Sequence, residues 1–143
     1  MDNVYLACRG VSRNRFSLIR PRADDALVNA AEMLVEAVHL TGEKDRLVGE
    51  LAYGQQRQLE IAMVLATQPD VLLLDEPLAG MGAEEAALMV ELLRKLAPQH
   101  AILLVEHDMD AVFALADVIT VMVNGQVLES GPPAQIRASA AVR

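Results

Sequence analysis

The stretch Val71-Leu72-Leu73-Leu74-Asp75-Glu76-Pro77 decides the fold class. Four consecutive apolar residues are typical of a strand covered on both faces, and two carboxylates follow at its carboxyl end. In open α/β sheets, ligands bind at that end. Two adjacent acids are costly to bury unless a cation neutralises them, as a nucleotide-bound Mg²⁺ would. Taken alone, the stretch indicates either such a site or two exposed acids that cap a helix.

Helical and extended patterns alternate around this stretch. Apolar spacing predicts helices at about 24–40, 55–66, 83–96, 110–116 and 133–138, and further strands at 101–105, 118–123 and 126–129. Asn124-Gly125 lies between the last two strands and is a strong hairpin signal. The order predicts an α/β fold with an open, mainly parallel sheet and an antiparallel hairpin at its edge. The residues expected to face inward are Leu27, Ala31, Leu34, Val38, Leu59, Ala62, Met63, Ala66, Val90, Leu93 and Leu96.

Composition and charge narrow the class of protein. Apolar residues make up 53% and charged residues 22% of the 143 residues, which indicates a globular chain. No apolar run approaches the roughly 18–20 residues that cross a bilayer. Met1-Asp2-Asn3 does not resemble a signal peptide, and the lone Cys8 fits a reducing compartment. We therefore expect a cytoplasmic protein whose membrane role, if it has one, is peripheral.

The net charge of −8 is unevenly distributed. Residues 1–22 carry five arginines against Asp2, a balance of +4, so the remainder carries −8 − 4 = −12. An acidic chain of this kind is a poor nucleic-acid binder. The arginine cluster (Arg9, Arg13, Arg15, Arg20 and Arg22) is read either as a solvated arm or as a contact to RNA, lipid headgroups or a partner loop.

Two further segments could act on phosphate. Val105-Glu106-His107-Asp108 ends the second buried strand, and neighbouring parallel strands would bring His107 near Glu76. A histidine there can bind a γ-phosphate or the attacking water, although it could also be structural; His39 and His100 lack such neighbours and are read as structural or surface residues. Leu51-Ala52-Tyr53-Gly54-Gln55-Gln56-Arg57 opens a helix whose N–H groups suit a phosphate, with an ordinary loop-to-helix junction as the alternative.

The order and spacing of these segments resemble the ATP-binding subunits of ABC transporters. Leu51–Gln55 looks like the signature motif, Val71–Glu76 the Walker B strand, Leu78–Met81 the D-loop and His107 the switch histidine. The resemblance covers residues 24–138 well. Leu51–Arg57, Leu59–Ala62, Ala79–Met81 and Glu106–Met109 are similar to importers of branched-chain amino acids, and importers of urea or short amides share much of this pattern.

The resemblance implies a fold and a set of roles. Residues 1–50 would be a remnant of the helical subdomain, and 51–143 the C-terminal half of the ATPase core. Asp75 would hold Mg²⁺ through water, Glu76 would be the catalytic base, and His107 would contact the γ-phosphate. Residues facing ATP of the opposite subunit would be Leu51, Ala52, Tyr53, Gly54 and Gln55. Expected partners are a second ATP-binding subunit and membrane-embedded permeases, which the region before Leu51 would face, with no nucleic acid.

The sequence departs from the family pattern in three ways. Ala52 stands where serine is usual, and Met81 where aspartate is usual. No Gly-x-x-x-x-Gly-Lys-Ser/Thr loop, which would cradle the phosphates, occurs in the 143 residues. We therefore expect a fragment that begins inside the helical subdomain, binds ATP weakly or not at all and is inactive alone. An open apolar edge at Val71–Leu74 would make it self-associate.

Two other functions remain open at this point. The chain could be a non-catalytic interaction module that keeps the signature face to dock on a partner. It could also come from an ABC ATPase of translation or DNA repair. Repair members usually carry a long coiled coil before the signature, and the sequence shows no such heptad run.

Overall fold

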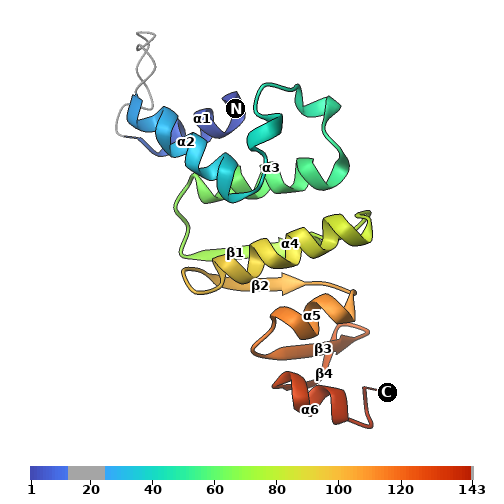
Figure 1. Cartoon of the computed structure of the whole chain (residues 1–143). Helices are drawn as coiled ribbons and strands as arrows, with labels where there is room; N and C mark the ends of the chain where they lie inside the picture. The colour runs from blue at the N-terminus through green and yellow to red at the C-terminus, as the bar shows by residue number, and fades with distance from the viewer. Residues whose placement is uncertain (13–24, 143) are drawn as a thin grey trace. The chain divides into compact units, whose positions relative to one another are not determined.

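The computed structural model describes residues 1–12 and 25–142 (Figure 1). Its elements are α1 (Asp2–Val11), α2 (Asp25–Ala37), η1 (Thr41–Glu43), η2 (Val48–Glu50), α3 (Tyr53–Leu65), β1 (Val71–Asp75), α4 (Ala83–Leu96), β2 (Ala101–Val105), α5 (Met109–Leu115), β3 (Ile119–Val123), β4 (Gln126–Gly131) and α6 (Pro133–Ala138). They form two compact units, Met1–Leu104 and Val105–Arg143. Of the arginine cluster, Arg9 lies on α1, and the other four arginines lie outside the described residues.

Helices α1, α2 and α3 pack together in the first unit. Val4 and Cys8 lie one turn apart on α1 and are both buried, as are Ala31 and Val35 on α2. Residues four apart share one helix face, so each helix places an apolar stripe against its neighbours. Burial raises the pKa of the Cys8 thiol, which favours its uncharged form in this small core.

Strands β1 and β2 form a parallel pair, and α4 connects them and runs alongside them in Figure 1. Leu72 of β1 is only 1% exposed, and α4 buries Met89, Leu92 and Leu93. The predicted bounds of α4 and β2 are confirmed, and β1 extends the predicted strand by one residue, Asp75. The predicted α/β class is confirmed as well.

The expectations that the first strand is covered on both faces and that the strand 101–105 is buried are both wrong. Leu73 of β1 is 72% exposed and Leu103 of β2 is 62% exposed. Leu72, which precedes Leu73 in β1, is buried. Side chains alternate between the two faces of a strand, and α4 can cover only one of them. Met63 was also expected to be buried but is 36% exposed, because the inward stripe of α3 runs through Leu59, Ala62 and Leu65 instead.

The second unit contains the predicted hairpin. β3 and β4 pair antiparallel, with Ile119 opposite Gly131 and Val123 opposite Gln126. Asn124 and Gly125 have φ of 50° and 77°, the two positive values that this tight turn requires. Helix α6 lies against β4, where the Ser139 hydroxyl and the Gln135 amide donate to the Glu129 carboxylate. These hydrogen bonds, the one from Ser139 first, hold the pKa of Glu129 below its usual value.

Within the described ranges 1–12 and 25–142, no helix combines the length and the apolar character that crossing a membrane requires.

The exposed apolar face of the β1–β2 pair predicts self-association. Val71, Leu73 and Leu103 lie on it, and their burial between two copies would be favourable. Light scattering should detect dimers or larger species, and Leu73→Ser should lower the mass. Met33→Ser is a matched control, because Met33 on α2 is 71% exposed, close to the 72% of Leu73. A clean monomer for the parent chain would contradict the prediction.

Candidate functional site

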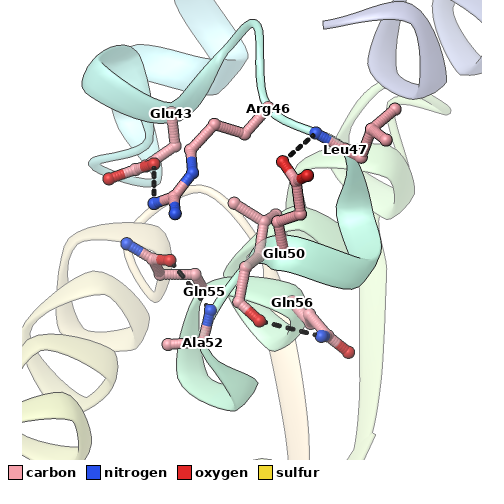
Figure 2. Close-up of polar contacts among 8 residues, drawn as sticks. Glu43, Arg46, Leu47, Glu50, Ala52, Gln55 and Gln56 are labelled. Atoms are coloured by element: carbon pink, nitrogen blue, oxygen red, sulfur yellow. Dashed lines mark hydrogen bonds and ion pairs between the residues drawn. The ribbon is translucent and has the colours of Figure 1, made fainter.

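The segment Leu51–Gln55, here called the signature turn, forms the N-terminus of α3. Ala52 precedes the helix in an extended conformation and has no side-chain acceptor. The Gln55 Oε1 atom accepts from the Ala52 N–H at 3.0 Å, and Gln56 Nε2 donates to the Leu51 carbonyl at 3.0 Å (Figure 2). Two glutamine side chains therefore shape the turn. The first N–H groups of the helix have no intrahelical acceptor and can face an anion.

A charged pair lies beside the signature turn. Arg46 Nη1 donates to Glu43 Oε2 at 2.8 Å, as Figure 2 shows. The hydrogen bond from Arg46 lowers the pKa of Glu43, and Gln55 adds a smaller contribution in the same direction. The Gln55 side chain also accepts from the Ala52 N–H, so it helps to order the turn.

Gly54 also lies against α4 within this chain, and its expected role toward ATP stays a prediction. A Cβ atom on Gly54 would lie 2.9 Å from the Cδ of Glu85 and 3.2 Å from its Cβ. A side chain at position 54 would therefore displace the side chain of Glu85 on α4. The sequence indicates only the local role of Glu85, which stands three residues after Gly82 at the spacing of a helix cap. Its carboxylate accepts from the Gly82 N–H at 3.2 Å.

Asp75 and Glu76 lie at the carboxyl end of β1, and both are exposed. Glu76 has φ of 44°, which is uncommon for a residue with a side chain and occurs at sites where the surroundings impose it. The segment Glu76–Gly82, here called the Glu76 turn, continues with the Ala79 N–H donating to the Glu76 carbonyl at 3.1 Å and the Met81 N–H to the Leu78 carbonyl at 3.2 Å. The predicted placement of the two carboxylates is therefore confirmed.

The carboxylates suit a magnesium ion that also binds phosphate. In the part of the chain that the structure describes, no group of three or more His, Cys, Asp or Glu side chains could hold a metal by itself. Mg²⁺ commonly takes one or two carboxylates and completes its shell with waters and phosphate oxygens. The exposed Asp75 carboxylate fits that arrangement.

His107 belongs to the second unit, where its neighbours hold its backbone. The Glu106 carboxylate accepts from the N–H of His107 at 3.0 Å and from that of Asp108 at 3.4 Å. The Glu106 side chain has no exposed surface, whereas the His107 side chain is 73% exposed. A buried anchor thus presents an outward-facing imidazole. That His107 approaches Glu76 stays a prediction, because the two residues belong to different units.

The other histidines carry no such arrangement. His39 is exposed, with φ of 61° at the end of α2, and His100 Nδ1 lies 2.8 Å from the Pro69 carbonyl oxygen. The reading of these two as surface or structural residues agrees with these positions. Sequence reasoning did not identify Glu85, Gln56 or the buried carboxylate of Glu106 as supports, because their partners become evident only once the turns are folded.

Asp108 is the N-cap of α5, a role that an aspartate just before the predicted helix 110–116 favours. Its Oδ1 atom accepts from the N–H groups of Asp110 and Ala111 at 3.0 and 3.1 Å. Asp108→Ala should cost about 1 kcal/mol of local stability, so hydrogen exchange at Asp110 and Ala111 should accelerate about fivefold. Asp117→Ala, at an exposed position outside α5, is the control. Unchanged exchange in Asp108→Ala would show that the cap does not hold the helix.

Comparisons with known proteins agree with this geometry. A family model described as ABC transporter matches residues 8–79, half of the chain. The chain is 45% identical over 115 residues to the branched-chain amino acid transport ATP-binding protein BraF of Pseudomonas aeruginosa, covering 79% of this chain and 45% of BraF. It is 42% identical over 118 residues to LivG of Escherichia coli K12, named for the same transport, covering 81% and 46%.

Solved structures show the same fold. The ATP-binding cassette MJ1267 of an ABC transporter superposes with a TM-score of 0.79 at 26% identity, over 98% of this chain and 60% of that one. The protein cbiO1 of Clostridium perfringens, part of an ABC transporter complex, gives 0.78 at 27% identity, over 97% and 54%. The chain spans about half the length of the curated relatives it matches. With the family model covering half of its residues, the chain belongs to the ABC transporter family of ATP-binding proteins.

Proposed function

We propose that this chain is part of the ATP-binding and ATP-hydrolysing subunit of an ABC-type importer of branched-chain amino acids. The observation that carries the proposal is the presence, in one compact unit, of an anion-binding helix N-terminus and an exposed Asp75-Glu76 pair after β1. The names of the relatives at 45% and 42% identity support the substrate class.

The carboxylates would divide the chemistry of hydrolysis. Asp75 would hold Mg²⁺ through water, and the ion would neutralise charge on the phosphates. Glu76 would orient the attacking water and accept its proton, since its exposed carboxylate stands on a turn fixed by backbone hydrogen bonds. His107 would donate a hydrogen bond to the γ-phosphate from the anchored turn that Glu106 holds.

The signature turn would bind the γ-phosphate of ATP that the opposite subunit holds. Ala52 offers no hydroxyl, so the N–H groups at the start of α3 and the positive end of its dipole would carry the contact. Two subunits would then enclose the nucleotides between them. The helical region before Leu51 would face membrane-embedded permease subunits, which would place the protein at the cytoplasmic face of the cell membrane.

ATP-dependent capture tests this function. The tagged chain should retain a complete ATP-binding family member in MgATP, and retain less of it without nucleotide. Ala52→Asp should weaken this capture at least about tenfold, because a carboxylate would stand opposite the γ-phosphate. The same change should not unfold α3, since aspartate is a better N-cap than alanine. Ala52→Ser, the residue usual in the family, is the matched control and should retain capture.

Capture that does not depend on ATP, or that survives Ala52→Asp, would overturn the proposal. ATP-independent capture would instead favour a non-catalytic interaction module.

Direct nucleotide binding should be weak in the chain alone. Its 143 residues contain no phosphate-binding loop sequence, so few donors remain to hold ATP within one copy. Isothermal titration with MgATP should detect no binding tighter than about millimolar, a free energy of roughly 4 kcal/mol. Micromolar affinity would show that other residues of this chain bind the phosphates.

A further inference from the structure

Tyr53 of the signature turn contacts Gly80 of the Glu76 turn. A Cβ atom on Gly80 would lie 3.3 Å from Cε1 of Tyr53 and 3.6 Å from its Cδ1. Gly80 also has φ of 76°, a conformation that favours glycine. The phenol ring therefore packs against the backbone of Gly80, 27 residues away in the sequence, and a side chain there would make the ring move by a few tenths of an ångström.

Arg57 fixes the position of that ring. Its Nη2 atom donates to the Tyr53 hydroxyl at 2.9 Å, and its guanidinium carbon lies 5.3 Å from the ring centroid. Glu60 in turn pairs with Arg57 Nη1 at 2.6 Å. The hydroxyl bond and the cation–π contact restrict the ring from the α3 side, and the ring lies against Gly80.

A second contact joins the same two segments. The Glu85 side chain covers Gly54, with its Cδ 2.9 Å from where a Cβ would stand, and its carboxylate accepts from the Gly82 N–H. Gly82 ends the Glu76 turn, and Gly54 belongs to the signature turn. The two turns therefore meet at two places. Tyr53 of the signature turn lies against Gly80 of the Glu76 turn, and Glu85 of α4 lies against Gly54 of the signature turn.

We propose that Tyr53 is a positioning residue that couples the signature turn to the Glu76 turn, so that the two move as one body. A displacement of the signature turn then shifts the backbone that carries Glu76, with Glu85 keeping the distance between the segments. The functional role of this coupling rests on the proposed function, in which the signature turn binds ATP and the Glu76 turn carries the catalytic base. The contact itself lies within one copy of the chain.

Hydrogen exchange in the nucleotide-free chain tests the coupling. Tyr53→Ala should accelerate exchange at Ala79 and Met81, whose N–H groups are bonded inside the Glu76 turn, by about tenfold. Tyr53→Phe keeps the ring and loses only the hydroxyl bond, so it should restore exchange close to the parent rate. Met63→Ala, a truncation elsewhere on α3, should leave both amides unchanged.

Three outcomes would overturn the proposal. The first is an unchanged rate at Ala79 and Met81 in Tyr53→Ala. The second is a Tyr53→Phe chain that behaves like Tyr53→Ala, since the hydroxyl bond, and not the contact of the ring with Gly80, would then carry the effect. The third is equal acceleration across α1 and α2, which would report general loosening; Tyr53→Leu, which keeps most of the volume, should avoid it. Failure of ATP-dependent capture would leave these rates unaffected, so the two proposals fail separately.

Discussion

The close approach of α3 to the turn that follows β1 is the constraint on which the site depends. Gly54 lies under Glu85 and Gly80 lies under Tyr53, and neither glycine has room for a side chain without movement of its neighbour. These contacts join a helical segment to a sheet segment across residues far apart in the chain. The N-terminal end of α3 and the carboxylates after β1 therefore belong to one compact unit.

The carboxylates after β1 are placed where a ligand can reach them. Asp75 and Glu76 are exposed at a strand end, and Glu76 holds a positive φ. A carboxylate in such a place can bind a cation that also carries phosphate. The same unit exposes an apolar face at Leu73 and Leu103. The chain spans about half the length of the curated relatives it matches.

Local patterns allowed much of the fold to be predicted from the sequence. The Asn124-Gly125 turn, the Asp108 cap and the bounds of α4 and β2 each depend on a few adjacent residues. The exposure of Leu73 and Met63 could not be predicted, because it depends on which layers cover a strand or helix. The same holds for the site: Asp75 and Glu76 follow from the strand, but the support of Glu85 for Gly54 requires two segments to meet.

ATP turnover tests the central claim most directly. The test uses a fusion protein in which the phosphate-binding segment of a complete family member precedes this chain. ATP hydrolysis by this fusion is compared with hydrolysis by its Glu76→Gln variant. The substitution removes the proton acceptor and keeps the size of the side chain. The account predicts Mg²⁺-dependent hydrolysis that falls at least about hundredfold in Glu76→Gln. Equal turnover in the two proteins would contradict it, because Glu76 would then not be the base.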